Sequence, residues 1–171
     1  MGIFDFFKKK RNIDNENGLN EVYSDNGNGV LEERFYKKSG VKDGVYECYY
    51  KNGQLNIESN WKDGKMSGLA KYYLENGQLE QESNWKYGKT NGLLKKYYKN
   101  GKLMEEINYN NGNKEGLAKY YSENGQLENE INYKMRANSK ECKDVGIVTH
   151  YKGKPLTGIF YELFDNMKIK R

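Results

Sequence analysis

Residues 72–92, YYLENGQLEQESNWKYGKTNG, have close copies before and after them in the chain. The Asn-Gly pair of this stretch, Asn76-Gly77, recurs in steps of 24 residues, at Asn52-Gly53, Asn100-Gly101 and Asn124-Gly125. A tyrosine, a leucine, a glutamate and an aromatic residue keep the same step, namely Tyr49, Tyr73, Tyr97, Tyr121, Leu55, Leu79, Leu103, Leu127, Glu58, Glu82, Glu106, Glu130, Trp61, Trp85, Tyr109 and Tyr133. A fixed period of this length is the signature of a repeat array.

Each repeat is predicted to be a β-hairpin. Asn-Gly between β-rich runs favours a two-residue type I′ turn, because both residue types tolerate positive φ. A second turn, such as the one at residues 86–92, reverses the chain again and leads into the next hairpin. The sequence therefore predicts an all-β protein, an elongated and twisted single antiparallel sheet of tandem 24-residue hairpins.

The two-residue turn also predicts which residues face each other. Lys71 is expected opposite Glu82 and Leu74 opposite Leu79, and the same rule pairs Lys95 with Glu106, Lys119 with Glu130, and Glu47 with Glu58. A three-residue loop with a bulge would shift this register. Alternation then predicts an aromatic face made of Tyr46, Tyr50, Leu55, Ile57, Trp61, Tyr72, Leu74, Leu79, Trp85, Leu94, Tyr98, Leu103, Ile107 and Tyr109. The opposite face is expected to carry the Lys-Glu pairs and a structural ladder of Tyr49, Tyr73, Tyr97 and Tyr121.

The repeats divide the chain. Residues 1–17 form an N-terminal tail or cap, and residues 18–133 form the array, with a degenerate repeat at 18–43 and regular repeats at 44–67, 68–91, 92–115 and 116–133. Residues 134–145 are interpreted as a polar insertion loop. Residues 146–171 resemble the start of a further repeat and are expected to form a C-terminal capping hairpin.

Composition sets limits on function. The hydrophobic fraction is 36% and mean hydropathy is −1.09, but 14% of the residues are aromatic, so a core would be built mainly from tyrosine and leucine. The net charge is +5, yet 24 acidic residues are interleaved with 29 basic ones, and no continuous basic track is visible. Nucleic acid is therefore an unlikely partner. Cys48 and Cys142 are far apart and form no metal-binding motif, which favours a cytoplasmic protein without a disulfide framework.

No pattern typical of an enzyme is found. His150 is the only histidine, and nucleophile, zinc-protease and phosphate-loop motifs are absent. The recurring glutamates Glu58, Glu82, Glu106 and Glu130 are expected roughly 10 Å apart, which is too far to share one metal ion. A non-enzymatic protein is expected, with no cofactor, no metal and no small-molecule substrate.

The repeat consensus YYxENGQLxxExNWKxGKxxGL resembles the MORN-repeat variant (membrane occupation and recognition nexus) of the bacterial proteins commonly labelled YwqK-type antitoxins. The resemblance covers residues 18–133 and returns at 146–171. It implies a sheet that binds another macromolecule and performs no chemistry. The specific expectation is an antitoxin or immunity-like protein that binds and neutralises a partner, such as a toxin, and the predicted partner-binding residues are Trp61, Tyr72, Trp85, Tyr98 and Tyr109.

The N-terminal segment IFDFFKKKR leaves an alternative open. Phe4, Phe6, Phe7, Lys8, Lys9, Lys10 and Arg11 have the composition of a short anchor for an anionic membrane surface. The alternative function is a peripheral membrane scaffold, located at the inner membrane. Equally, the same apolar residues could cap the exposed edge of the first hairpin.

Overall fold

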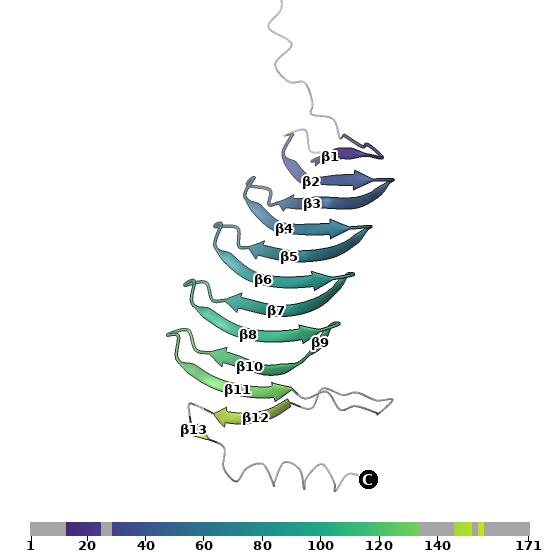
Figure 1. Ribbon diagram of the computed structural model, residues 1–171. Coiled ribbons are helices and arrows are strands. Elements are labelled where there is room, and N and C mark those ends of the chain that lie inside the picture. Colours follow the sequence, from purple (N-terminus) through teal and green to yellow (C-terminus); the bar gives the residue numbers. More distant parts are fainter. Residues whose placement is uncertain (1–12, 25–28, 134–145, 152–153, 156–171) are drawn as a thin grey trace, which may run out of the picture.

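The chain forms one open antiparallel sheet (Figure 1). A computed structural model describes residues 13–24, 29–133, 146–151 and 154–155. The strands are β1 (Gly18–Tyr23), β2 (Leu31–Lys38), β3 (Val41–Tyr49), β4 (Leu55–Lys62), β5 (Lys65–Tyr73), β6 (Leu79–Lys86), β7 (Lys89–Tyr97), β8 (Leu103–Asn110), β9 (Asn113–Lys114), β10 (Gly116–Tyr121), β11 (Leu127–Tyr133), β12 (Gly146–Tyr151) and β13 (Lys154–Pro155). Each strand pairs with the strands before and after it in the chain, with one exception. The short strand β9 pairs only with β8, and β10 also pairs with β8. The predicted fold class is confirmed.

The sheet continues across the predicted insertion. Residues 134–145 lie outside the described part of the chain, but β12 pairs antiparallel with β11 from Asn129 opposite Tyr151 to Tyr133 opposite Gly146. The array is thus extended on the far side of the insertion by β12 and by the two-residue strand β13, which pairs with β12. Most of the predicted capping hairpin, residues 156–171, is also outside the described residues.

The segment before β1 covers part of the first edge of the sheet. Ile13 and Glu21 exchange two backbone hydrogen bonds of 2.8 and 3.0 Å, and the Gly40 N–H donates to the Glu16 carbonyl at 2.9 Å. The bonds to Glu21 satisfy backbone groups that the edge strand β1 would otherwise leave open, and the bond from Gly40 ties the same segment to the turn between β2 and β3. Residues 13–17 therefore act as a cap, whereas the proposed membrane contacts Phe4 to Arg11 lie outside the described residues.

Among the described residues, the type I′ turns are found at the second turn of the repeats up to residue 115. Tyr87 and Gly88 have φ of 52° and 79°, and Lys86 pairs with Lys89 across them. Positive φ at both central residues of a two-residue loop defines this turn, whose twist matches that of the flanking strands. Equivalent pairs with positive φ stand at Ser39-Gly40, Asp63-Gly64 and Asn111-Gly112.

The prediction of a two-residue turn at Asn76-Gly77 is wrong. Only the glycine has positive φ, at 83°, and its N–H donates to the Leu74 carbonyl at 2.8 Å. The Leu74 N–H in turn donates to the Gln78 carbonyl at 2.8 Å, which closes a three-residue loop. Asn76 accepts the Gln78 N–H through its side chain at 3.0 Å, so asparagine serves here as a local hydrogen-bond acceptor.

A register shift next to this loop corrects part of the predicted pairing. Leu79 lies opposite Tyr73 instead of Leu74, with the shift between Tyr72 and Tyr73. Because directly opposite residues share a face of the sheet, Leu79 belongs beside the tyrosine ladder and not on the aromatic face. The same holds for Leu55 and Leu103, which lie opposite Tyr49 and Tyr97. Tyr50 and Leu74, also predicted on the aromatic face, lie instead in the loops after β3 and β5.

The remainder of the predicted register is confirmed. Lys71 lies opposite Glu82, and the pairs Lys95 and Glu106, Lys119 and Glu130, and Glu47 and Glu58 are also found. Among these paired residues, however, the ion pairs that form join neighbouring hairpins. Lys95 Nζ lies 3.4 Å from Glu82 and Lys119 Nζ lies 3.4 Å from Glu106. This row of charges therefore links each repeat to the one before it.

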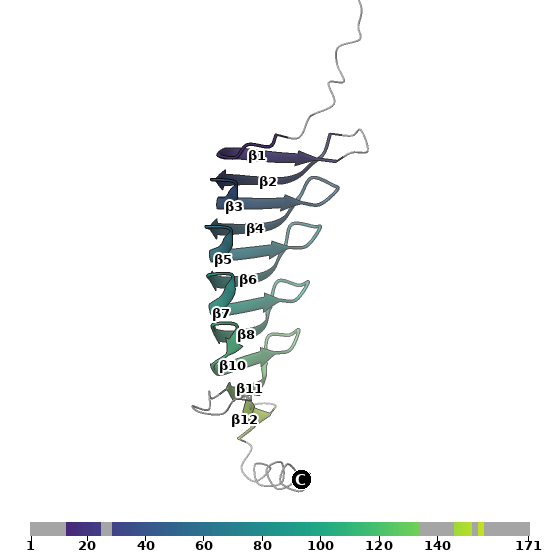
Figure 2. The same cartoon turned by 90° about the vertical axis from the view of Figure 1, so that its right-hand side faces the viewer.

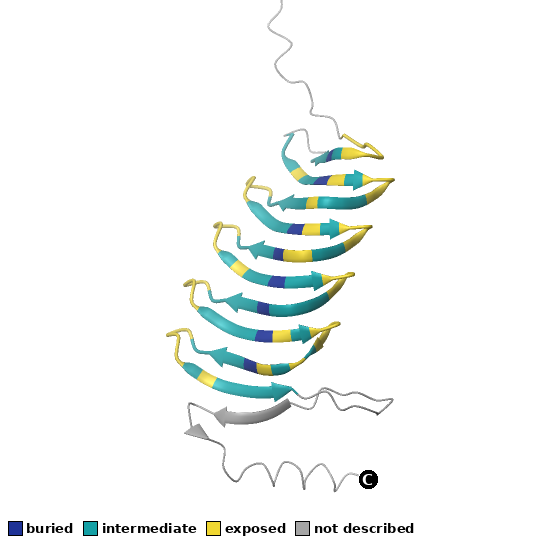
Figure 3. Ribbon diagram, in the orientation of Figure 1, coloured by how far each residue is buried: buried dark blue, intermediate teal, exposed yellow. Residues whose placement is uncertain are grey.

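The buried residues all lie on one face. The middle of the strands holds Phe35, Ser59, Ala70, Ser83, Leu94, Ile107 and Ala118, each at most 9% exposed, and their register aligns them across the sheet. On the opposite face Val45, Leu69 and Leu117 remain 39–41% exposed. A single-layer sheet can bury the side chains of one face if it curls toward that face. The bent strands are visible in Figures 1 and 3.

Candidate binding surface

The aromatic face offers large side chains above a row of buried small ones. Trp61 donates its indole N–H to Ser59 Oγ at 3.0 Å, and Trp85 donates to Ser83 Oγ at 2.9 Å. Both serines are at most 1% exposed, while both indoles are half-buried. Each indole is therefore held against a serine of its own strand, two residues away on the same face. Its N–H is hydrogen-bonded, and part of its ring is open to a partner.

Two kinds of packing unit occur along the array, one in its first half and the other in its second half. Repeats 44–67 and 68–91 carry Ser-Asn-Trp, whereas the next two carry Ile-Asn-Tyr, at residues 107–109 and 131–133. A small residue thus goes with a large indole, and a large aliphatic residue goes with a smaller phenol. Close-packed interiors conserve volume in this way. The sequence carried this signal, but its meaning depends on the two residues sharing a face.

An aromatic cluster surrounds a lysine at the first repeat. Lys42 Nζ lies 3.9 Å from the ring centroid of Tyr46, 4.7 Å from that of Phe35 and 5.2 Å from that of Trp61. Burial lowers the pKa of Lys42, although the Glu33 carboxylate at 3.9 Å opposes this effect. Cation-π contacts of this kind hold the rings in place from one strand to the next.

A second cluster lies where repeat 92–115 meets repeat 116–133. Lys114 Nζ is 5.1 Å from the ring centroid of Tyr133, and the hydroxyls of Tyr120 and Tyr133 are 3.3 Å apart. Burial, together with the hydrogen bond to Tyr133, raises the pKa of Tyr120. Met66 and Thr90 occupy the equivalent lysine position in the two central repeats. The centre of the aromatic face is therefore uncharged at this position, and both ends carry a lysine.

The predicted partner-binding residues do not all lie together. Trp61, Tyr72 and Trp85 lie on the aromatic face of β4, β5 and β6, and Tyr109 is on β8 opposite Gly92. Tyr98 instead belongs to the loop after β7, where its hydroxyl donates to the Tyr121 carbonyl at 2.6 Å. Its role there is to join two loops, and it is not part of the aromatic face.

The tyrosine ladder lies on the opposite face and binds the glutamate row. The hydroxyls of Tyr49, Tyr73, Tyr97 and Tyr121 donate to Glu47, Glu58, Glu82 and Glu106 at 2.7, 3.5, 2.9 and 3.2 Å. Three of these four bonds connect one hairpin to the next. Burial, and then the hydrogen bond to Glu82, raises the pKa of Tyr97 to about 12.

This shift predicts a loss of stability in alkali. The phenol can donate to Glu82 only while it is protonated, so its contribution is complete below its ordinary pKa of 10.0 and disappears as the pH rises toward about 12. The urea midpoint is expected to fall across this range, and to fall less in the Tyr97→Phe variant. Phenolate absorbance measured in parallel should show one fewer late-titrating tyrosine in that variant. An unchanged pH profile would contradict the assignment.

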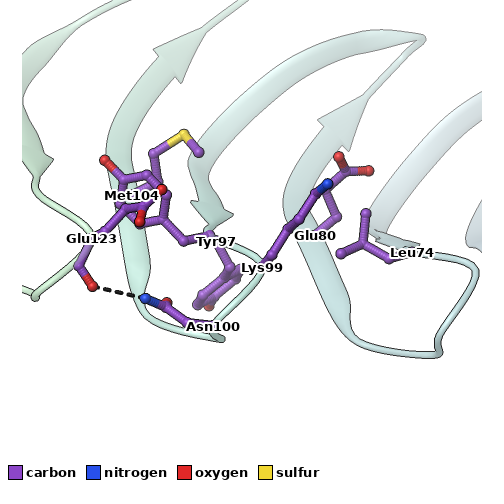
Figure 4. Close-up of a pocket in the computed structure, with 8 residues that line it drawn as sticks. Leu74, Glu80, Tyr97, Lys99, Asn100, Met104 and Glu123 are labelled. Atoms are coloured by element: carbon purple, nitrogen blue, oxygen red, sulfur yellow. Dashed lines mark hydrogen bonds between the residues drawn. The ribbon is translucent and has the colours of Figure 1, made fainter.

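The loops after β3, β5, β7 and β10 form a stack in which side chains of one loop bond to the backbone of the next. These bonds are missing between the loops after β5 and β7, and we call this position the open joint. The loop at Tyr50 is bonded to the next through Tyr50 Oη to the Tyr73 carbonyl at 2.7 Å, and Asn52 to the Glu75 carbonyl at 3.1 Å. Tyr98 and Asn100 make the same bonds to the loop that follows them. Leu74 has no hydroxyl, and Asn76 turns to Gln78, at 2.9 Å. A shallow pocket lies at this open joint, and Leu74, Glu80, Tyr97, Lys99 and Met104 are among the residues that line it (Figure 4).

Closing the open joint is expected to stabilise the array. Leu74→Tyr would place a hydroxyl where Tyr50 and Tyr98 carry theirs, within reach of the Tyr97 carbonyl, and should add about 1 kcal/mol to the free energy of unfolding. The reciprocal change, Tyr98→Phe, should remove about as much. Urea denaturation followed by circular dichroism measures both. A loss of stability in Leu74→Tyr would show that the joint has no space for the ring.

The described residues hold no group of three or more His, Cys, Asp or Glu side chains suited to a metal ion. Within the same residues, no helix is long and apolar enough to cross a membrane. Register also keeps successive glutamates of the charged row apart, with Lys71 between Glu58 and Glu82 and Lys95 between Glu82 and Glu106.

The repeat pattern of the MORN repeat variant matches four consecutive segments of the chain, residues 42–63, 66–87, 90–111 and 114–135. The chain belongs to the MORN repeat variant family. Each matched segment contains one hairpin with its Asn-Gly loop, and the segments follow one another at the 24-residue step. MORN repeats form scaffolds for contacts with proteins or membranes. No curated protein matches the chain.

Proposed function

We propose that this MORN repeat protein is a non-enzymatic scaffold that binds another protein across its aromatic face. The observation that carries the proposal is the pair of indoles at Trp61 and Trp85, each fixed by a bond to a buried serine and each partly open. Ordered tryptophans lose little conformational freedom on binding, and they are among the residues that contribute most to protein interfaces.

The specific form of the proposal is an antitoxin or immunity-like action in the cytoplasm. The partner would be a protein whose activity is blocked when the aromatic face covers it. Preformed binding surfaces suit this role, because inhibition requires a long-lived complex and pre-organisation mainly lengthens the lifetime of a complex. Support comes from the resemblance of the repeats to those of proteins labelled YwqK-type antitoxins, and from the indoles held in place on Ser59 and Ser83.

Affinity capture tests the binding proposal. The tagged full chain is used as bait in a lysate of its native cells, with Trp85→Ala as the test variant and Leu117→Ala as the matched control, since Leu117 is a 40% exposed residue on the opposite face. A stoichiometric protein should be retained by the wild type and the control and weakened at least about tenfold by Trp85→Ala. Equal retention by both variants would exclude the aromatic face.

Co-expression tests the antitoxin form. The captured protein, produced alone, should arrest growth, and the wild-type scaffold should restore it while Trp85→Ala should not. A captured protein that is harmless when produced alone would remove the antitoxin role and leave the scaffold role intact.

The sequence of the N-terminal segment favours a second candidate, attachment to an anionic membrane through residues 3–11. Deleting residues 1–11 should abolish sedimentation with vesicles containing phosphatidylserine and leave partner capture unchanged. Persistent sedimentation of the deletion variant would count against this segment as the anchor.

A further inference from the structure

The type I′ turns gather lysines along one long edge of the sheet. Lys62 faces Lys65 across the turn between β4 and β5, and Lys86 faces Lys89 across the turn between β6 and β7. Lys38 ends β2 at the turn before them. All five side chains are exposed, and we call them the lysine rim. The turns that carry them follow one another along the right-hand edge of the sheet in Figure 1, and Figure 2 shows the same succession from the side.

The lysine rim contradicts the pairing rule that the rest of the sheet follows. In the middle of the strands lysine lies mostly opposite glutamate, as Lys95 does with Glu82 and Glu106. At the rim, like charges lie directly opposite each other, which is unfavourable. The turn itself does not require lysine, because Asn110 faces Asn113 at the corresponding turn of the next repeat. The positive charge at the rim therefore has a cost without a visible role in folding.

These charges are not neutralised within the part of the chain that the structure describes. No ion pair is formed there by any of the five rim lysines, whereas the neighbouring Lys37 and Lys42 are paired with Asp14 and Glu33. The nearby Asp43 carboxylate accepts the backbone N–H of Asp63 at 3.2 Å. Lys86 lies 5.8 Å from the ring centroid of Tyr87, a side chain that is 77% exposed at the tip of its turn.

The rim runs along the edge where the proposed binding face ends. Lys62 and Lys86 directly follow Trp61 and Trp85 in the chain, so strand alternation directs them toward the charged face at this edge, next to the strand ends that carry the indoles. A partner held on the aromatic face would meet them where it passes over this edge. Protein interfaces combine an aromatic centre with a charged border that sets orientation and association rate. We propose that the lysine rim binds an acidic segment, rich in Asp and Glu, of the protein held on the aromatic face. This inference rests on the proposed function and specifies the chemistry of the partner.

The spacing of the rim favours carboxylates over a phosphate polymer. Successive turns are about 10 Å apart, twice the strand spacing. Acidic side chains seven residues apart on a helix repeat at about 10 Å, whereas phosphates follow one another every ~3.4 Å along a nucleic-acid strand.

The test uses a fluorescein-labelled peptide of ten glutamates as the probe and the full chain in low salt. Anisotropy titration should show binding that weakens as salt is added. The variant K86Q/K89Q should raise the Kd by about tenfold. The control K51Q/K99Q removes the same charge from exposed lysines of the opposite, loop edge and should change the Kd less than about twofold.

Several outcomes would overturn the inference. These are no binding of the probe in low salt, equal effects of the two double variants, or tighter binding of a ten-nucleotide oligothymidine or of phosphatidylserine vesicles that K86Q/K89Q abolishes. The last result would assign the rim to phosphate.

The partner from the capture experiment separates this inference from the proposed function. If Trp85→Ala releases the partner and K86Q/K89Q does not, the rim assignment fails and the aromatic face stands. If neither variant releases it, the aromatic face fails as well, whatever the probe shows.

Discussion

Ile107→Ala is expected to lower the free energy of unfolding by about 2–4 kcal/mol. Ile107 is the largest side chain that is less than 2% exposed among the described residues, and it lies opposite Leu94 in the buried row. A single-layer sheet has no second layer that could move in to fill the space, so most of the cavity should persist. Urea denaturation followed by far-ultraviolet circular dichroism measures the loss.

Leu117→Ala is the matched control for this prediction. Leu117 is also a branched aliphatic residue in a strand, but it lies on the charged face and is 40% exposed. Its truncation should cost less than about 1 kcal/mol. Equal losses in the two variants would show that the sheet is not stabilised from the aromatic face. Because Trp61 and Trp85 lie in the first two regular repeats, indole fluorescence additionally reports whether the loss spreads to neighbouring repeats.

Ser83→Ile is expected to lower the free energy of unfolding by roughly 2–4 kcal/mol, and a second substitution should reverse much of it. The larger side chain overpacks a site that is 0% exposed, at a cost of about 1–3 kcal/mol, and it removes the acceptor of the Trp85 indole N–H, at a cost of about 1 kcal/mol. Adding Trp85→Tyr recreates the Ile107 and Tyr109 unit of the next repeat. The double variant should recover at least about 1 kcal/mol relative to Ser83→Ile.

Trp85→Tyr completes this double-mutant cycle, and Ser83→Ala separates the loss of the hydrogen bond from the overpacking. Ser83→Ala removes the hydrogen bond without overpacking and should cost about 1 kcal/mol. Trp85→Tyr alone leaves space above Ser83 and should also be destabilising. If the effects of Ser83→Ile and Trp85→Tyr on the free energy of unfolding are strictly additive, residues 83 and 85 pack independently. This result would contradict the exchange of volume between the two kinds of unit.

The sequence alone predicted the fold and the register of the strand centres. Repetition at 24 residues and alternation of apolar and charged residues suffice for this, because a slip of one residue would turn Trp85 and Ser83 to the charged face. The facing pair of Lys71 and Glu82 and the unfavourable pair of Glu47 and Glu58 were therefore predictable.

Turn geometry was less predictable. Asn-Gly is compatible both with a two-residue turn and with a three-residue loop ending in glycine, and the choice depends on the strands beside it. The two-residue turn was found instead at Tyr87-Gly88, where tyrosine adopts positive φ against its own preference. The misplacement of Leu79 followed from this one ambiguity.

What the sequence determined by itself is therefore an open antiparallel sheet of hairpins with one aromatic face, because strand alternation and repeat period are local properties of the chain. Only the tertiary structure decided that the indoles are fixed on Ser59 and Ser83, that Tyr98 joins loops, and that lysines spread through residues 38–89 meet along one edge. The physical reason is that these contacts arise between residues brought together by turn type, bulge and curl. Lysines that alternate with acidic residues along the chain are brought together in space, because every second turn lies at the same edge of the sheet.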